Sequence, residues 1–425
     1  MMWHGTNRTR TTAVLLSVLC TLSVPNIVQA AEVQGGTGTV QSSVEMKVRH
    51  AYPVRSPYAL PSMAEQTLAK NARSAVVMDY ATGKVLFEKD AHEELPMASI
   101  TKVMTLLLIM EAIDDGKLKL TDKIKTSDYA ASMGGSQIFL EAGETMTAND
   151  MIKGIAIASG NDASVAMAEH LYGSEEAFVA RMNERAKELG MDDTHFSNCN
   201  GLPTANHYSS AHDIAIMSRE LLKHEEITKY TSVYSDYLRK GSDHPLWLVN
   251  TNKLIRFYDG ADGLKTGYTA EAKYCLTATA KRDGFRVITV VMGEPKSSVR
   301  NAEVSQLFNW SFSQFTSKVL YRQGEMIGSM KVAHGVPETV NYKAGDTVGV
   351  IQEKGKKMDY ETKVNLFRVS APVKENQRVG TLQVYEDDDL VAEVPLLAEK
   401  AVKRAGFFQS MGQTIRDLVT FGKGR

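Results

Sequence analysis

A serine and a lysine lie three residues apart at Ser99 and Lys102, in front of a mostly apolar run at 103–110. On a helix, side chains at this spacing face the same way and lie within contact range. A serine hydroxyl becomes a good nucleophile only when a base removes its proton. A lysine can be that base only as the neutral amine, so burial or a second cation must lower its pKa. Because serine at a helix start is also a common N-cap, this pair alone predicts either an activated serine or a cap.

Two further polar motifs follow along the chain. Ser159-Gly160-Asn161 lies between two predicted helices, and Lys265-Thr266-Gly267 lies at the start of a predicted strand. The order S-x-x-K, serine–asparagine loop, K-T-G resembles the signature of penicillin-binding proteins and class A β-lactamases. The glycine in S-G-N, and the lack of a recognisable Glu-containing deacylation loop between the second and third motifs, favour the penicillin-binding proteins.

The resemblance is carried by longer segments as well, including "DYATGKVLFEKDAHEELPMASITKVMT" and "TNKLIRFYDGADGLKTGYTAEAKYCLTATA". It covers residues 65–315 and extends less distinctly beyond them. The sequence is thus similar to the serine-type D-alanyl-D-alanine carboxypeptidases, the low-molecular-weight penicillin-binding proteins. This similarity implies an α+β fold with a five-stranded antiparallel sheet and a helical cluster, then a small all-β domain and a C-terminal amphipathic helix.

The resemblance also implies catalytic roles. Ser99 would attack the carbonyl of the penultimate D-alanine in a peptidoglycan stem peptide, and Lys102 would be its general base. Lys265, as a nearby second cation, would help to keep Lys102 neutral. Ser159 would bridge the two lysines and pass the proton to the leaving D-alanine. Asn161 would bind the substrate backbone and fix Lys102.

Substrate-binding roles follow in the same way for Lys265, Thr266, Gly267, Tyr268 and Arg300. The backbone N–H groups of Ser99 and Tyr268 would form the oxyanion hole. Thr266 and Arg300 would bind the terminal carboxylate, for which an arginine offers a bidentate contact. The alternative for Arg300 is a surface arginine at a helix start.

The implied activity is removal of the terminal D-alanine, with β-lactams as inhibitors that acylate Ser99. Two alternatives remain open, a D,D-endopeptidase that cuts cross-links and a penicillin-binding scaffold without turnover. We expect no metal and no cofactor. His195, His207, His212 and His244 do not have the pattern of a zinc peptidase and are expected to be solvated or packed.

The elements that position these motifs can be predicted from patterns. Residues 74–90 alternate around Ala81-Thr82-Gly83-Lys84 as in a hairpin, and Asp283-Gly284 separates two further β-rich runs. Residues 99–114 have helical spacing. A sheet whose first and last strands come from opposite ends of the domain, with a helical insert between them, is therefore expected.

Helix boundaries are also marked. Thr147 with Asp150, and Ser210 with Asp213, are capping pairs, while Gly173 and Gly190 are placed as stops. The segment "SVRNAEVSQLFNWSF" is predicted to be a helix that closes the domain. Gly134-Gly135-Ser136 resembles a turn of the same family.

The two ends of the chain indicate export. Arg8 and Arg10 precede the uncharged residues 11–31, and Val28-Gln29-Ala30 fits a signal peptidase site. An uncleaved anchor and a lipoprotein at Cys20 are the weaker alternatives. At 399–425, apolar residues follow one helical face and basic residues outnumber acidic ones, which fits a helix on an anionic membrane or a helix packed on its own domain. We therefore predict a signal peptide (1–30), a spacer (31–62), a D,D-peptidase domain (63–315), a small β domain (316–398) and a C-terminal membrane-anchor helix (399–425).

Composition excludes other classes. Lys+Arg 49 against Asp+Glu 50 gives a net charge of −1, so no strong field favours nucleic acid. Only Cys199 and Cys275 would remain after cleavage, and they are expected to be isolated thiols. The predicted location is outside the cytoplasmic membrane, on its outer face or in the cell wall space.

Overall fold

A five-stranded antiparallel sheet organises the first part of the structure, a computed structural model that describes residues 68–356, 359–386 and 388–406. The strand order is β2-β1-β9-β8-β7, and two strands from the beginning of the domain pair with three from its end, as predicted. The strands are β1 (Ser74–Asp79), β2 (Val85–Lys89), β7 (Ala261–Thr269), β8 (Lys273–Arg282) and β9 (Phe285–Glu294). The predicted signal peptide and spacer lie outside the described residues.

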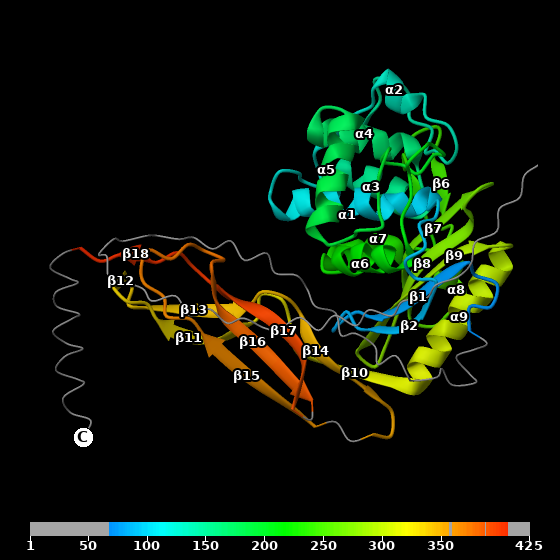
Figure 1. Cartoon of the computed structure of the whole chain (residues 1–425). Helices are drawn as coiled ribbons and strands as arrows, with labels where there is room; N and C mark the ends of the chain where they lie inside the picture. Colours follow the sequence, from blue (N-terminus) through cyan, green and yellow to red (C-terminus); the bar gives the residue numbers. More distant parts are fainter. Residues whose placement is uncertain (1–67, 357–358, 387, 407–425) are drawn as a thin grey trace, which may run out of the picture. The chain divides into compact units, whose positions relative to one another are not determined.

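Helices between β2 and β7 form the helical insert, and α9 follows β9. Figure 1 shows α1 to α7 gathered on one face of the sheet and α8 and α9 on the other. The helices and 3₁₀ turns are η2 (Ala98–Thr101), α1 (Lys102–Asp114), α2 (Asp128–Ala131), α3 (Ala148–Ala158), α4 (Asn161–Tyr172), α5 (Glu175–Glu188), α6 (Ala211–Leu221), η3 (Glu225–Ile227), α7 (Thr228–Thr231), α8 (Leu254–Phe257) and α9 (Ser297–Gln314). Two short hairpins complete this part: β3 (Lys123–Lys125) with β4 (Thr145–Thr147), and β5 (Ser235–Leu238) with β6 (Leu246–Val249).

Both faces of the sheet are buried, because successive side chains along a strand pack into two different cores. Val76 and Met78 of β1 pack into the core beneath the helical cluster, whereas Ala75 and Val77 pack on the side of α9. Successive side chains of a strand point to opposite faces, so a strand covered on both sides becomes apolar throughout. The sheet therefore lies between two apolar cores, and β7, which carries K-T-G, lies at its edge.

The predicted caps of α3 and α6 and the predicted stop of α4 are confirmed. Thr147 and Ser210 accept hydrogen bonds from the backbone N–H groups of Asp150 and Asp213 at the N-termini of α3 and α6. Gly173 ends α4 with φ 84°, a conformation that glycine adopts without strain. Asn161 is the first residue of α4, directly after the Gly160 N-cap.

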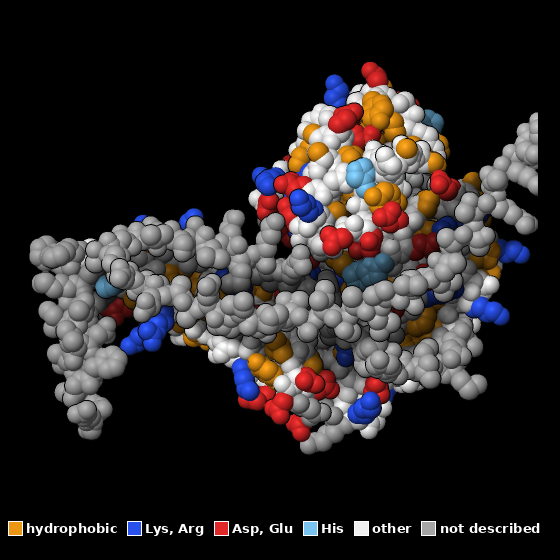
Figure 2. Space-filling view, in the orientation of Figure 1, with side chains coloured by type: hydrophobic (Ala, Val, Ile, Leu, Met, Phe, Trp, Pro, Cys, Tyr) orange, Lys and Arg blue, Asp and Glu red, His pale blue; other side chains and the backbone are white. Residues whose placement is uncertain are grey.

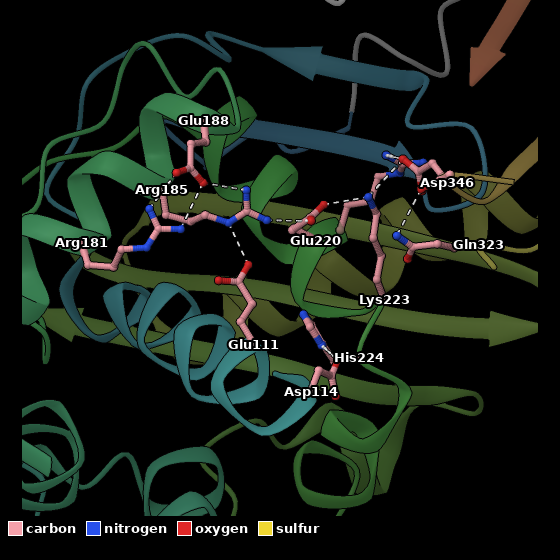
Figure 3. Close-up of polar contacts among 12 residues, drawn as sticks. Glu111, Asp114, Arg181, Arg185, Glu188, Glu220, Lys223, His224, Gln323 and Asp346 are labelled. Atoms are coloured by element: carbon pink, nitrogen blue, oxygen red, sulfur yellow. Dashed lines mark hydrogen bonds and ion pairs between the residues drawn. The ribbon is translucent and has the colours of Figure 1, made fainter. Parts of the chain in front are cut away.

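A set of ion pairs connects three helices of the cluster. Arg185 of α5 donates to Glu111 of α1 at 2.8 Å and to Glu220 of α6 at 2.9 Å, as Figure 3 shows. All three side chains are largely buried, so solvent screens these pairs less than it screens exposed pairs. They fix the far end of α1, the helix whose N-terminus carries the serine–lysine pair.

The second part is the predicted small β domain. Its main sheet has the order β11-β13-β17-β16-β15, accompanied by the pairs β10–β14 and β12–β18. The strands are β10 (Phe315–Tyr321), β11 (Met326–Lys331), β12 (Gly335–Val336), β13 (Thr339–Ala344), β14 (Val348–Glu353), β15 (Tyr360–Leu366), β16 (Arg378–Glu386), β17 (Asp389–Ala398) and β18 (Lys403–Arg404).

One predicted boundary is wrong. Residues 399–406 belong to the β domain and not to a helix, because Lys403 pairs with Val336 and Val402 is hydrogen-bonded to Val373. Val402 is also buried in the core of this domain, so its apolar character reflects packing. The rest of the predicted amphipathic helix, 407–425, lies outside the described residues.

Charged side chains of both signs are interspersed on the face shown in Figure 2, as the net charge of −1 suggests. Within the described residues, none of the helices has the length and apolar character needed to cross a membrane. In the same part of the chain, no group of three or more His, Cys, Asp or Glu side chains could hold a metal ion. Cys199 and Cys275 are both buried free thiols, which confirms that prediction.

Candidate active site

Ser99 lies in the 3₁₀ turn η2, immediately before α1 begins at Lys102. The sequence predicted one helix from residue 99, but the first turn is tighter, so the serine precedes the α-helix proper. The Lys102 Nζ lies 3.1 Å from the Ser99 Oγ. The two side chains are therefore within hydrogen-bonding distance, which proton transfer between them requires.

The environment of Lys102 suits a neutral amine. Its side chain is fully buried, and burial lowers its pKa from 10.5 to about 7. Its Nζ donates to the Asn161 Oδ1 at 2.6 Å and to the backbone carbonyl oxygen of Asn200. A neutral amine has two N–H groups and one lone pair, so these two acceptors use the N–H groups and leave the lone pair for the Ser99 hydroxyl. The arrangement can therefore remove a proton from Ser99.

Asn161 is held by the Gly134-Gly135-Ser136 turn. Its Nδ2 donates to the Gly134 carbonyl at 2.6 Å, and its backbone N–H donates to the Ser136 carbonyl at 2.7 Å. Gly135 has φ 79°, and a Cβ there would lie 2.8 Å from the Asn161 Nδ2, so only glycine fits. This turn fixes the amide orientation, and the carboxamide oxygen faces Lys102.

Lys265 lies in the middle of β7 rather than at its start, with its side chain almost fully buried. Burial lowers its pKa well below the ordinary value, and the positive charges of Lys102 and Arg300 lower it further. For Lys102 itself the main cause of the lowered pKa is burial. Repulsion between two ammonium groups is mutual, so a proton on either lysine disfavours a proton on the other.

Ser159 ends α3 in a left-handed conformation with φ 66°. Its Oγ is buried, and no hydrogen-bond partner for it lies among the described residues. The structure thus places Ser159 beside Asn161 but does not form the predicted bridge between the two lysines. A hydroxyl without a partner in a buried place is free to turn toward a substrate or a lysine.

Gly267 lets the edge strand approach the serine turn. A Cβ at Gly267 would lie 2.7 Å from the Met97 carbonyl oxygen and 3.2 Å from the Ala98 Cβ. Any larger residue would push β7 away from η2. The next residue, Tyr268, is 56% exposed, and its ring lies against the ring of Tyr274 with centroids 4.4 Å apart.

Arg300 is buried in the first turns of α9, with only 5% exposed, so the alternative of a surface arginine is wrong. Within the described residues it makes no ion pair. Its Nε and Nη2 donate to the Asn301 Oδ1 at 3.1 and 3.0 Å, and its Nη1 donates to the Cys275 carbonyl at 3.4 Å. Burial and the neighbouring Glu303 raise the pKa of the nearby Glu294 carboxyl to about 8, which weakens its charge as a partner for Arg300. Arg300 therefore keeps an uncompensated positive charge close to Lys265, which an incoming carboxylate can neutralise.

Two members of this site were missed in the sequence. The Asn200 carbonyl accepts from Lys102, and the Thr251 Oγ accepts from the Thr266 Oγ at 2.7 Å. Neither contact has a spacing signal, since one uses the backbone and the other joins side chains fifteen residues apart. Gly201 lets this backbone approach the serine turn closely, since a Cβ at Gly201 would overlap the Ala98 carbonyl.

Comparison with known proteins agrees with this geometry. The model of the family described as D-alanyl-D-alanine carboxypeptidase matches residues 61–296, and that of the penicillin-binding protein 5 C-terminal domain matches residues 315–404. The chain is 50% identical to the D-alanyl-D-alanine carboxypeptidase DacF of Bacillus subtilis, over 83% of this chain and 92% of that protein. It is 33% identical to the D-alanyl-D-alanine carboxypeptidase DacC of Escherichia coli, over 81% of this chain and 88% of that protein.

Solved structures give the same result. Penicillin-binding protein 5 from Haemophilus influenzae aligns with a TM-score of 0.63 at 29% identity, covering 81% of this chain and all (100%) of that one. Penicillin-binding protein D2 from Listeria monocytogenes, solved in the ampicillin-bound form, aligns with a TM-score of 0.53 at 30% identity. The alignment covers 59% of this chain and 100% of that one. The chain therefore belongs to the D-alanyl-D-alanine carboxypeptidase family of serine peptidases, peptidase S11.

Proposed function

We propose that this protein is a serine D,D-carboxypeptidase that removes the terminal D-alanine from peptidoglycan stem pentapeptides through an acyl-enzyme on Ser99. The single observation that carries the proposal is the buried Lys102 amine 3.1 Å from the Ser99 hydroxyl. The names of the relatives and the ampicillin-bound form of the Listeria protein support the substrate class and β-lactam binding.

Acylation begins when Lys102 takes the Ser99 proton and the Ser99 oxygen bonds to the carbonyl carbon of the penultimate D-alanine. The oxygen of the resulting tetrahedral intermediate is stabilised by the backbone N–H groups of Ser99 and Tyr268. Collapse breaks the peptide bond, and the proton held by Lys102 passes through Ser159 to the departing D-alanine nitrogen. Water then attacks the ester, with Lys102 again as base, and releases the shortened peptide and a free Ser99.

The positively charged side chains of the site are proposed to orient the substrate. The terminal carboxylate would lie between Arg300, Lys265 and the Thr266 hydroxyl, and Gly267 would let the substrate backbone lie along β7. Asn161, held by the Gly135 turn, would bind the peptide backbone on the other side. The uncompensated charge of the buried Arg300 supports this direction of binding.

Replacing Arg300 by glutamine is expected to raise KM for a peptide ending in D-Ala-D-Ala by about 10- to 100-fold, because a charge-assisted hydrogen bond contributes about 1.5–3 kcal/mol. The change in kcat should be smaller, since the serine and lysine are untouched. The measurement is D-alanine release against peptide concentration, with Arg256→Gln on the exposed side of α8 as the matched control. An unchanged KM in Arg300→Gln would argue against a carboxylate site here.

The rate of acylation is expected to fall as the pH is lowered through about 7, because the Lys102 pKa lies near that value. Below it the amine carries a proton and cannot act as a base, so the rate should drop about tenfold per pH unit. Above pH 8 it should level off. The measurement is the second-order rate constant for labelling by a fluorescent penicillin from pH 5.5 to 9, and a flat profile would contradict this role of Lys102.

The experiment that tests the function incubates the purified protein with a free pentapeptide and, separately, with a cross-linked peptide dimer. Steady release of D-alanine from the first supports the carboxypeptidase. Cleavage of only the dimer would instead indicate the D,D-endopeptidase. A single burst of D-alanine without turnover would indicate the penicillin-binding scaffold. Mass spectrometry after β-lactam labelling then reports whether Ser99 carries the adduct.

We also propose that the protein is exported and held at the outer face of the cytoplasmic membrane by its C-terminal segment. The charge of 407–425 and the uncharged run at 11–31 support this location. Deleting 407–425, which spares strand β18, is expected to move the protein from the membrane pellet to the soluble fraction and to leave D-alanine release unchanged. A truncated protein that still sediments with membranes would refute the anchor.

A further inference from the structure

The residue before the nucleophile has an unusual backbone conformation. Ala98 has φ 48°, in the left-handed region that residues other than glycine rarely adopt. Such strain persists only where surrounding contacts enforce it. Because Ser99 is the next residue, the Ala98 conformation sets the direction of the Ser99 side chain.

A chain of hydrogen bonds reaches Ala98 from the segment after α5. The Thr101 Oγ1 donates to the Ala98 carbonyl at 2.8 Å, and the His207 Nε2 lies 2.6 Å from the same Thr101 Oγ1. The backbone N–H of Ser197 donates to the His207 Nδ1 at 2.9 Å. Thr101 is fully buried and His207 is 8% exposed, so water does not compete for these bonds.

The hydrogen bonds of this series have only one consistent donor-to-acceptor direction. A backbone N–H can only donate, so the His207 Nδ1 must be an acceptor and the proton of the neutral ring must be on Nε2. The Nε2–H then donates to Thr101, whose own proton is left for the Ala98 carbonyl. Burial lowers the His207 pKa to about 4, which keeps the ring neutral and the direction fixed at neutral pH.

We propose that His207 is a positioning residue for the nucleophile: through Thr101 it fixes the Ala98 carbonyl, and thereby the strained turn that presents Ser99 to Lys102. This role rests on the proposed function, in which Ser99 is the nucleophile. His207 does not touch the substrate or the reacting atoms. It acts by preventing the Thr101 hydroxyl from turning away from Ala98.

Two variants of His207 separate this role from packing. Glutamine can place an N–H at the position of Nε2 and keep the bond to Thr101, whereas asparagine can only replace the acceptor at Nδ1. Each variant keeps one of the two hydrogen bonds, so we expect similar unfolding temperatures. The acylation rate constant for a fluorescent penicillin should fall about 5- to 10-fold in His207→Asn, the loss expected for one neutral hydrogen bond, and stay within about twofold in His207→Gln.

Variants of Thr101 give an independent measurement if either His207 variant folds poorly. Thr101→Val removes the hydroxyl at constant shape and should slow acylation as His207→Asn does, and Thr101→Ser should restore the rate. Combining Thr101→Val with His207→Asn should add no further loss, because both changes break the same chain. The noncovalent dissociation constant of the penicillin should change little, since only the turn that carries Ser99 is affected.

The outcomes distinguish the two proposals. Wild-type protein without an adduct on Ser99 would overturn the proposed function and this inference with it. Labelling of wild-type Ser99 together with equal acylation rates in the asparagine and glutamine variants, whether both normal or both reduced, would overturn the inference alone. A Thr101→Ser variant as slow as Thr101→Val would also overturn it.

Discussion

Replacing Lys102 by methionine is expected to lower the rate of Ser99 acylation by about 10³- to 10⁴-fold, the upper range for loss of a general base. Methionine keeps most of the volume of the buried side chain but has no nitrogen to accept the serine proton. The measurement is the pseudo-first-order rate of labelling by a fluorescent penicillin at pH 8, where the wild-type amine is mostly neutral.

A matched control is available in the same domain. The Lys89 Nζ donates to the backbone carbonyls of Ala69, Lys70 and Ala72, so Lys89→Met also removes an amine from a set of oxygen acceptors. We expect this control to lose stability but to acylate at the wild-type rate per folded molecule. Equal rates in the two methionine variants would show that Lys102 is structural and that another group is the base.

Much of the fold could be predicted because local rules and the global arrangement agree. An Asp-Gly pair between two β-rich runs, such as Asp283-Gly284, is a strong local signal for a hairpin turn. A serine followed three residues later by an aspartate, as at Ser210, is a local signal for a helix N-cap. Each of these signals depends on only a few neighbouring residues, so it can be read without knowing the tertiary structure. The serine–lysine pair, Asn161 and Lys265 could be assigned to one site for another reason: their order along the chain resembles the signature of the penicillin-binding proteins.

The features that escaped prediction depend on contacts between distant segments. The apolar residue Val402 fits a helical pattern, but a pairing with Val373 in the β domain decides its conformation. Likewise, the hydroxyl of Thr251 and the carbonyl of Asn200 meet the motif residues only after the chain has folded. His207 was expected to pack or be solvated, and its buried bond to Thr101 is also a contact that no spacing rule contains.

Replacing Ser99 by alanine is expected to abolish covalent labelling and to reduce D-alanine release by at least about 10⁴-fold, because no acyl-enzyme can form. The measurements are intact-protein mass after β-lactam treatment and D-alanine release from the pentapeptide. Ser132, an exposed serine at the end of α2, gives the control Ser132→Ala, which should behave as wild type. An adduct that persists in Ser99→Ala would mean that another residue is the nucleophile.

The double variant Ser99→Ala with Lys102→Met makes the strongest test, since it asks whether the two residues act as one unit. If the only catalytic task of Lys102 is to take and return the serine proton, removing it after Ser99 is gone should cost almost nothing further, so the effects should be far from additive. Additive losses would instead mean that the buried amine contributes separately, for example by orienting the substrate through Asn161, to which it donates at 2.6 Å. Strong non-additivity is therefore expected only if the proton moves directly across the 3.1 Å contact between the Lys102 Nζ and the Ser99 Oγ.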